Sequence, residues 1–582
     1  MEQLMKLMID GVEVEVPAGT TVLEAAKQAG IKIPTLCYLK DINQIGACRL
    51  CMVDTGARAL QAACVLPVSP NMVVKTNTPA IREARKINLE LLLSNHDKSC
   101  LSCTRNQSCE LQQLCHDLGI DDENRFAGSM NKYDIDDLSP SIVRDNNKCV
   151  LCRRCVAACN KTQAVGVIGP VNRGFVTSIE SPWNMKLTDM ACINCGQCIA
   201  ACPTGALHEK DSTAKVWALL ADPKKHVVVQ PAPAVRAALG EEFGLPMGTC
   251  VTGKLATALH RLGFDRVFDT DFGADLTIME EATELLHRLK NGGALPMITS
   301  CSPGWIKFCE HYYSDFIPNL STCKSPHEME GAMIKTYYAQ QAGIDPKQIA
   351  VVSVMPCTAK KYEALRPELG HDGMQDVDEV ITTRELARMI KEAGIDFANL
   401  PDGTFDSLLG ESTGAAVLFG ATGGVMEAAL RTAYETVTGQ TLTQVEFNQV
   451  RGIEGIKEAA VQLGDTTLNV AVVNGTANAA KLLDSIRAGK KTYHFIEIMG
   501  CPGGCVTGGG QPIVSAQKRM DCDPRVLRAA ALYKEDADKP IRKSHENPEI
   551  KKIYADFLGE PNSHKAHELL HTTYTARPKY SR

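Results

Sequence analysis

The pattern of apolar and polar positions divides the chain near residue 211. At its start, LMKLMIDG and VEVEVP alternate as two strands, and Asp10-Gly11 between them suits a tight hairpin turn. TVLEAAKQAG follows with helical spacing, beginning near Thr21 and ending at Gly30. Beyond residue 211, apolar runs such as HVVVQPAPAV and LNVAVVNG alternate with helical stretches such as EEATELLHRLKN. This alternation predicts α/β architecture in the second half.

Three strand-like runs in the second half share the same kind of ending. PMITSCSPGW, VVSVMPCTAKKYE and HFIEIMGCPGGCVTGGGQP pass from apolar residues into cysteine with Pro or Gly close by, at Cys301, Cys357, Cys501 and Cys505. Ligands in open α/β sheets gather beyond the carboxyl ends of strands, so these ends are predicted to converge. Four converging thiolates meet the requirement of a [4Fe–4S] cluster. Buried packing thiols at turns are the alternative, and the shared context of four cysteines favours the cluster.

Composition narrows the class of protein. At roughly 150 residues per domain, 582 residues suggest about four domains. The 24 cysteines cluster at C-x-x-C spacings instead of forming a disulfide framework, which favours metal clusters in a reducing cytoplasm. The net charge of −6 argues against a nucleic-acid-binding surface. No apolar run approaches ~18 residues, and no signal-peptide or twin-arginine pattern opens the chain, so neither a membrane span nor export is expected.

Residues 1–78 hold the first cysteine set, spaced C-x10-C-x2-C-x12-C at Cys37, Cys48, Cys51 and Cys64. A leading cysteine, a close pair and a distant fourth resemble the plant-ferredoxin way of holding a [2Fe–2S] cluster. A zinc ribbon, the alternative, would have two close pairs.

Residues 79–125 read as a helix followed by H-x3-C-x2-C-x5-C, at His96, Cys100, Cys103 and Cys109. By chemistry alone this could be a Cys3His zinc site. The motif resembles the His-ligated [4Fe–4S] module of the iron–sulfur subunit of respiratory complex I, and the neighbouring cluster motifs favour that interpretation over zinc. One imidazole in place of a thiolate should raise the reduction potential of such a cluster.

Residues 138–210 contain one motif twice, and the repeat is that of bacterial two-cluster ferredoxins. Its cysteines are Cys149, Cys152, Cys155 and Cys159, then Cys192, Cys195, Cys198 and Cys202. The fourth cysteine of each run ligates the other cluster in that pattern. Cys202 is therefore expected with the first three cysteines, and Cys159 with Cys192, Cys195 and Cys198.

The second-half motifs resemble the signatures of [FeFe]-hydrogenases. MPC-xx-Lys-xx-Glu (Cys357, Lys360, Glu363) and the Gly-rich stretch Glu497–Pro512 are similar to the second and third signatures, and Thr299–Trp305 is similar to the first. The resemblance runs through essentially the whole chain. It implies a multidomain α/β and α+β fold: a ferredoxin-like β-grasp [2Fe–2S] domain (1–78), a His-ligated [4Fe–4S] module (79–125), a two-cluster ferredoxin domain (138–210), a two-lobed α/β H-cluster domain (220–525) and a small-subunit-like helical wrap (526–582).

The resemblance also implies the cofactors and the reaction. The cofactors would be one [2Fe–2S] cluster, three accessory [4Fe–4S] clusters and an H-cluster, which is a cube joined through Cys505 to a two-iron unit bearing CO, cyanide and a dithiolate amine. The enzyme would interconvert H2 with protons and electrons. The expected pocket residues are Pro233, Met355, Lys360, Met499, Gly508 and Gly509.

A proton path is implied as well. Glu281, Glu284 and Arg288 share one helical face in TIMEEATELLHRL, and the resemblance adds Ser321 between the two glutamates. An ordinary salt-bridged face is the alternative. The family usually has two adjacent cysteines in its first signature, whereas this chain has Cys301 followed by Ser302. Because thiolate is the better ligand for iron–sulfur clusters, Cys301 is expected to bind the cube and Ser302 to act as a poorer proton carrier.

The expected partners are inferred from motifs that the sequence lacks. No flavin or dinucleotide motif is present, so coupling to NAD(P) would need flavin- and NAD(P)-binding iron–sulfur subunits, with ferredoxin as a further acceptor. The expectation is a hetero-oligomer, and an electron-bifurcating complex is one form of it. The rival functions are a hydrogen sensor, a purely electron-transferring iron–sulfur subunit and an iron–sulfur assembly protein.

Overall fold

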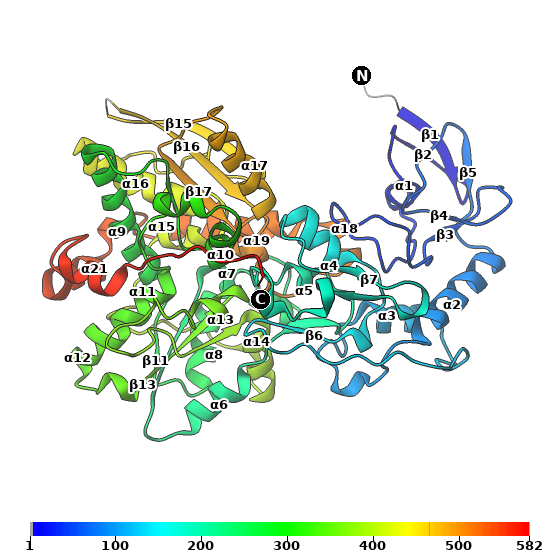
Figure 1. The fold of residues 1–582 in the computed structure, drawn as a ribbon, viewed down its shortest axis with the longest axis horizontal. Coiled ribbons are helices and arrows are strands. Elements are labelled where there is room, and N and C mark those ends of the chain that lie inside the picture. Colours follow the sequence, from blue (N-terminus) through cyan, green and yellow to red (C-terminus); the bar gives the residue numbers. More distant parts are fainter. Residues whose placement is uncertain (1–3, 465, 581–582) are drawn as a thin grey trace.

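The computed structural model describes residues 4–464 and 466–580. Figure 1 shows the N-terminal modules (blue to cyan) on one side of the molecule and a larger part with two sheets (green to orange) on the other. Among the described residues, no helix has both the length and the apolar character needed to cross a membrane.

The N-terminal module is a three-stranded sheet covered by one helix. The strands β1 (Leu4–Ile9), β2 (Val12–Pro17) and β5 (Met72–Val74) have the order β2-β1-β5. The predicted hairpin is confirmed: Asp10 and Gly11 both have positive φ, 48° and 87°. The predicted helix is also confirmed, because α1 (Val22–Gln28) begins after Thr21, whose side chain forms a capping box with Glu24. A short ribbon, β3 (Met52–Val53) and β4 (Gln61–Ala62), completes the module.

The next two modules consist of a few helices and two short strand pairs. The helices α2 (Pro79–Leu93) and α3 (Glu110–Asp117) flank the His96 motif. In the repeat, α4 (Arg154–Ala157) and α5 (Gln197–Ala201) each follow a C-x-x-C loop. The paired strands are β6 (Ile142–Arg144) with β9 (Leu207–Glu209), and β7 (Gly169–Val171) with β8 (Ser178–Glu180).

Two four-stranded sheets form the second half, as the alternating pattern predicts. The first, in the order β11-β10-β13-β14, is wholly parallel and contains β10 (His226–Pro231), β11 (Arg266–Val267), β13 (Ile349–Met355) and β14 (Glu379–Thr382). The second, in the order β12-β17-β16-β15, contains β12 (Met297–Ile298), β15 (Ile456–Leu463), β16 (Thr466–Asn474) and β17 (Phe495–Met499). In the second sheet, only the hairpin of β15 with β16 is antiparallel.

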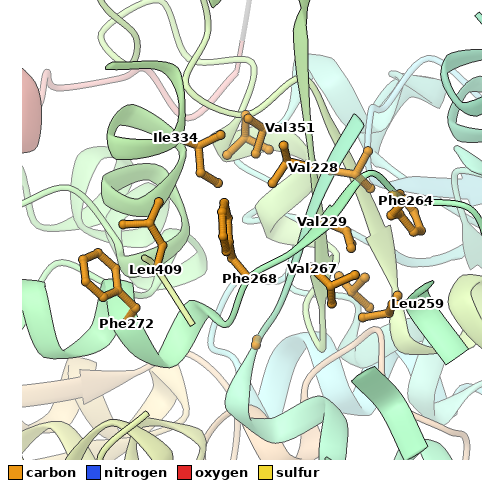
Figure 2. Close-up of a cluster of buried hydrophobic side chains, with 14 of the residues drawn as sticks. Val228, Val229, Leu259, Phe264, Val267, Phe268, Phe272, Ile334, Val351 and Leu409 are labelled. Atoms are coloured by element: carbon orange, nitrogen blue, oxygen red, sulfur yellow. The ribbon is translucent and has the colours of Figure 1, made fainter. Parts of the chain in front are cut away.

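The first sheet is buried on both faces, which explains its continuous apolar runs. Every residue of β13 is buried. Figure 2 shows Val228, Val229 and Val351 of this sheet with Phe268 and Ile334. The helices around the two sheets are α6 (Thr213–Ala221), α7 (Pro233–Arg236), α8 (Thr252–Arg261), α10 (Pro303–Tyr312), α11 (Pro326–Met333), α12 (Ala339–Ala342), α13 (Ala359–Glu363), α14 (Thr383–Glu392), α15 (Gly414–Val417), α16 (Gly424–Thr438) and α17 (Thr476–Arg487). The helix α18 (Ala516–Asp521) instead contacts the N-terminal module, where Met520 joins the core.

One long helix, α9 (Thr270–Asn291), joins the two lobes. Phe272 and Leu276 pack into the core of the first sheet, whereas Ala274 and Ile278 pack into the core of the second. The helix therefore fixes the position of one lobe relative to the other, and it carries the predicted proton-path carboxylates between them.

The C-terminal segment returns along the molecule. It contains α19 (Pro524–Asp538), α20 (Pro548–Ile553) and α21 (His564–Leu570), the last drawn in red in Figure 1. Its last described residues reach the ferredoxin-like module, where Tyr580 bridges to Met190 and the Ala191 N–H donates to the Lys579 carbonyl. The segment thus contacts both halves of the chain.

A buried ion cluster anchors this segment. Arg431 on α16 donates to both carboxylate oxygens of Asp536 on α19, at 2.8 and 2.9 Å. Arg542 donates to the same carboxylate at 3.2 and 2.7 Å. Arg431 and Asp536 are both fully buried.

We predict that Asp536→Ala lowers the free energy of unfolding by about 3 kcal/mol or more, because it leaves the Arg431 charge buried without its main partner. Thermal and denaturant unfolding of the cluster-loaded chain would measure this. The matched control is Asp538→Ala, two residues along the same helix and exposed. Equal stability of the two variants would contradict the anchoring role.

Candidate functional site

One cavity lies where the three strand ends meet. It is lined by residues that follow β12 and β17 of the second sheet and β13 of the first. All four second-half cysteines of the signatures, Cys301, Cys357, Cys501 and Cys505, line it together with Ser302. The structure therefore brings these residues to one place between the lobes.

Soft and apolar groups make up most of the remaining lining. They are Pro233 on α7, Phe419, Met355 at the end of β13 and Met499 at the end of β17, together with Gly508. Met355 and Met499 are each only 2% exposed. Gly509 does not line the cavity but lies directly behind it, against the ferredoxin-like module. Adaptable thioether side chains suit a preformed pocket for a bulky, weakly tethered group.

Cys357, Cys501 and Cys505 form one electrostatic group. Burial raises the pKa of Cys505 to about 12, and the nearby Cys357 thiol is the second-largest cause. Burial, followed by the Cys357 and Cys505 thiols, also raises the pKa of Cys501. Metal coordination deprotonates a thiol outright, so a bound metal cluster would offset this cost. The donor set therefore fits an iron–sulfur cube.

Cys301 and Ser302 lie on opposite sides of the chain. Ser302 has extended backbone, with φ −101° and ψ 102°, where successive side chains point to opposite faces. Its Oγ accepts a hydrogen bond of 3.1 Å from the N–H of Gly500, the residue before Cys501. Cys301 packs against the core cluster that includes α9, and after burial Glu281 has the largest effect in raising its pKa. The sequence predicts Cys301 as cube ligand and Ser302 as proton carrier; in the structure, Ser302 is the residue held beside the Cys501 loop.

Lys360 belongs to a polar cluster at the edge of the cavity. Its Nζ lies 2.6 Å from Glu363 Oε2 and donates to the Cys301 carbonyl at 3.3 Å. His327 also lines the cavity, but its Nε2 pairs with Glu363 at 2.8 Å and its Nδ1 pairs with Ser353 at 3.2 Å. Both of its ring nitrogens are thus engaged away from the cavity, whereas Lys360 has donors to spare.

The predicted proton-path residues form a continuous line. Ser321 Oγ donates to Glu284 at 2.9 Å and also interacts with Glu281, and Arg288 pairs with Glu284 at 2.6 Å. Glu281 and Glu284 are buried and Arg288 is partly exposed. Glu281 Oε2 has no hydrogen-bond partner among the described residues. The line therefore runs from the Cys301 side of the cavity toward the surface.

The outer end of this line contains residues that the sequence analysis missed. The Thr322 N–H donates to Glu284, and its hydroxyl pairs with His571 Nδ1 at 2.7 Å. His571 Nε2 lies 3.1 Å from Glu280. The sequence gives no signal for this contact, because His571 comes from the C-terminal segment, far along the chain.

The first accessory set brings its four cysteines together, and the second contains a buried histidine. In the first set, the thiol of Cys37 hydrogen-bonds with those of Cys48 and Cys64, and Cys51 with Cys64. In the second, burial lowers the pKa of His96 to about 4, and its Nδ1 has no partner among the described residues. A neutral imidazole with a free nitrogen suits metal ligation.

The repeat shows the interleaved grouping. The charges acting on Cys155 come first from Cys152, Cys149 and Cys202, and those acting on Cys198 come first from Cys192 and Cys159. Both C-x-x-C loops share a backbone feature: φ is positive at Leu151 and Arg153 in one copy, and at Asn194 and Gly196 in the other. Such turns direct backbone N–H groups inward, as in the 3.4 Å contact from Leu151 N to Cys149 Sγ.

Close contacts connect the cluster sets. A Cβ on Gly509 would lie 2.3 Å from the Cys195 carbonyl oxygen, and Thr358 Oγ1 donates to the Asn194 carbonyl at 2.7 Å. At the other end of the repeat, Asn43 donates to the carbonyls of both Cys37 and Cys152, at 2.7 and 3.0 Å.

The His96 module docks on the same end of the repeat. Its Glu110 N–H donates to the Pro203 carbonyl at 3.0 Å, and the Glu110 carboxylate binds Arg154 at 2.9 Å through both oxygens. A Cβ on Gly205 would lie 2.5 Å from Cys103 Sγ. The [2Fe–2S] module and the His96 module thus both contact the Cys149–Cys155 side of the repeat, whereas the Cys195 side contacts the cavity loops.

Family models match nearly the whole chain. The C-terminal domain of the iron-only hydrogenase large subunit matches residues 225–509, and the iron hydrogenase small subunit matches residues 523–577. Upstream, a 2Fe–2S cluster-binding domain matches residues 2–79, the iron–sulfur region of NADH-ubiquinone oxidoreductase G matches 85–124, and a 4Fe–4S dicluster domain matches 148–206.

Named relatives are similar over comparable lengths. The NADP-reducing hydrogenase subunit HndD of Solidesulfovibrio fructosivorans is 52% identical, over 99% of this chain and 100% of its own. Iron hydrogenase 1 of Clostridium pasteurianum is 44% identical over 98% of this chain and 99% of its own. The solved apo [FeFe]-hydrogenase HydA1 of Chlamydomonas reinhardtii, at 48% identity, matches 63% of this chain and 99% of its own with a TM-score of 0.57.

We predict that Glu281 makes stability depend on pH. Burial, followed by the Glu284 carboxylate, raises its pKa to about 8, against about 4.3 in an unfolded chain. The folded state therefore binds this proton more tightly, and its contribution to stability is complete at acid pH and lost as the pH rises toward 8. In Glu281→Gln, the unfolding midpoint should fall less over that range.

The exposed Glu123→Gln serves as the control and should follow the wild-type pH curve. A pH dependence of Glu281→Gln identical to that of the wild type would show that the carboxyl is already ionised at neutral pH.

Proposed function

The chain belongs to the iron-only, or [FeFe], hydrogenase family, and we propose that it is the H2-converting subunit of a larger NAD(P)-linked complex. It is an oxidoreductase acting on H2, with iron–sulfur domains that relay electrons. The observation that best supports the proposed site is the convergence of Cys357, Cys501 and Cys505 on one cavity that adjoins the ferredoxin-like module.

In our proposal, Cys357, Cys501 and Cys505 would hold the cube of the H-cluster, and Cys505 would also link it to the two-iron unit. When bound, this centre supplies the metal at which H2 is split and formed. Met355, Met499 and Pro233 exclude water from the cavity, because they line it with apolar side chains. Lys360 offers ammonium donors to the anionic ligands of the two-iron unit while Glu363 balances its charge.

Protons travel through side chains of the chain itself. Glu281 accepts a proton at its unpaired Oε2, and Ser321 connects it to Glu284. Arg288 stabilises the Glu284 carboxylate where the line approaches the surface. A pKa of about 8 suits a group that must both take and give a proton near neutral pH.

Electrons leave the cavity on its other side, from cluster to cluster, where backbone contacts bring the modules together. The Cys192–Cys198 loop lies against Gly509 and Thr358, so the cluster held by this side of the repeat is the first acceptor. The second cluster of the repeat then has two neighbours, the His96 module and the [2Fe–2S] module. The proposed counts are one [2Fe–2S] and three accessory [4Fe–4S] clusters.

The His96 module and the [2Fe–2S] module offer two exits for electrons. This suggests that partner subunits accept the electrons. The similarity to a subunit of an NADP-reducing hydrogenase supports a complex with flavin- and NAD(P)-binding iron–sulfur subunits, with ferredoxin as a further acceptor. A preparation of this chain alone that reduced NAD(P) with H2 at full rate would contradict the need for such subunits.

We predict that Ser321→Ala slows H2 uptake, measured with a viologen dye, by about 10²- to 10⁴-fold, because it breaks the link between the two glutamates. The infrared bands of the loaded centre should stay unchanged. Thr283→Val, whose hydroxyl bonds only to the Met279 carbonyl on α9, is the matched control. Unchanged uptake in Ser321→Ala would remove the serine from the path.

We predict that Gly509→Ala uncouples the cavity from the ferredoxin-like module. Its Cβ would meet the Cys195 carbonyl at 2.3 Å and push the two loops apart. Reduction of the accessory clusters by H2 should slow by about 10²-fold, whereas exchange between H2 and D2O, which needs no outer cluster, should persist. Gly128→Ala is the control, because no atom lies within 4 Å of its added Cβ. Normal cluster reduction in Gly509→Ala would refute this electron route.

A further inference from the structure

The first signature offers the cavity two different donors, the Cys301 thiol and the Ser302 hydroxyl. A cube held by protein needs four donors, and Cys357, Cys501 and Cys505 account for three. Which side chain completes the set is decided by its direction, because the two side chains leave an extended backbone on opposite faces.

Ser302 faces the third signature. It occupies the position just before α10, where a serine ordinarily accepts a hydrogen bond from its own helix. Here it makes no such bond, and its Oγ accepts instead from the Gly500 N–H at 3.1 Å. A Cβ on Gly500 would also lie 3.1 Å from this Oγ, so the glycine permits the close approach. The hydroxyl is thereby held beside the start of the Cys501 loop.

The helix that follows Ser302 lies against the ferredoxin-like module. A Cβ on Gly304 would lie 3.7 Å from both the Cys195 Cβ and the Ile193 carbonyl oxygen. Ser302 therefore lies in the region between Cys501 and the neighbouring cluster set, which is the side of the cavity expected for the cube.

Cys301 faces the proton path. Its side chain packs against the core cluster that contains Ala274 and Ile278 of α9, the helix that carries Glu281. Its carbonyl is held by Lys360. After burial, the largest influences on the pKa of its thiol are Glu281 and then Cys505, so Cys301 lies between the carboxylate line and the Cys505 side of the cavity.

We propose that Ser302 Oγ is the fourth protein ligand of the cube and that Cys301 is the innermost proton carrier. This inference rests on the proposed function, namely that the other three thiolates hold a cube here. As the Fe–O bond forms, the Ser302 O–H bond breaks and its proton leaves to solvent, with no change in oxidation state. The Gly500 N–H then stabilises the resulting alkoxide.

An oxygen ligand changes the properties of one corner of the cube. Iron–sulfur iron prefers thiolate, so the Ser302 corner is the weakest of the four and the one most open to exchange. Ligand identity and hydrogen bonding also set the reduction potential of a cluster. The cube should therefore differ, in its magnetic signal and its midpoint potential, from one that has four thiolates.

The test uses the full chain loaded with iron and sulfide alone, without the two-iron unit. Ser302→Cys, Ser302→Ala and Cys301→Ala are compared by iron content and by electron paramagnetic resonance of the reduced protein. The signal of the cube is obtained by subtracting the spectrum of a variant with Cys357, Cys501 and Cys505 all changed to alanine. Ser300→Ala is the control, since its hydroxyl donates to the Cys323 carbonyl and also interacts with Tyr574.

Ser302→Cys should keep all of its iron and shift both the cube's signal and its midpoint potential. Ser302→Ala should change the signal and make about four irons per chain removable by a chelator. Cys301→Ala should keep the wild-type signal and iron content. Retained accessory-cluster signals in each variant show that the chain has folded.

Loss of the cube in Cys301→Ala, or an unchanged signal and potential in Ser302→Cys, would overturn the assignment. The triple alanine variant tests the premise separately. If it keeps all of its iron, no cube occupies the cavity and the proposed function fails; if it loses about four irons while the Ser302 variants match the wild type, only the serine assignment fails.

Discussion

A backbone contact between Cys195–Gly196 and Gly509 sets the distance between the two halves of the molecule. A Cβ on Gly196 would lie 2.9 Å from the Gly509 Cα, and a Cβ on Gly509 would lie 2.3 Å from the Cys195 carbonyl oxygen. Only glycine fits such an approach without displacing backbone. In the proposed electron route, the distance between the buried centre and the next cluster depends on this contact, and therefore on the two glycines.

The rest of the fold maintains this contact. The α9 helix fixes one lobe against the other, and the C-terminal segment binds the catalytic part through Asp536 and the ferredoxin-like module through Lys579 and Tyr580. Buried charge is concentrated in paired groups such as Lys360 with Glu363. One oxygen of Glu281 is buried without a hydrogen-bond partner among the described residues, and burial raises the pKa of this carboxyl, as expected of a group that exchanges a proton inside a dry site.

Much of this arrangement could be predicted from the sequence because it depends on local spacing. The hairpin at Asp10-Gly11, the cap at Thr21 and the interleaved cysteine sets all follow from residues close together in the chain. The convergence of three strand ends followed from the rule for open α/β sheets. The roles of Cys301 and Ser302 were predicted from ligand preference alone, and ligand preference contains no information on which way each side chain points.

Contacts between distant segments could not be predicted. His571 beside Thr322, and Asn43 between Cys37 and Cys152, join parts of the chain whose local patterns are unrelated. His327 illustrates the same limit: it lines the cavity, but Glu363 and Ser353 engage both of its nitrogens, which only the packed structure reveals.

The central claim is that the cavity between the lobes holds an organometallic iron centre through Cys357, Cys501 and Cys505. Its most direct test is infrared spectroscopy of the full chain after loading with iron, sulfide and a synthetic two-iron precursor. The account predicts sharp bands from metal-bound carbonyl and cyanide that disappear when Cys505 is changed to alanine. Absence of such bands in the loaded wild-type chain would leave an electron relay without a catalyst and would contradict the account.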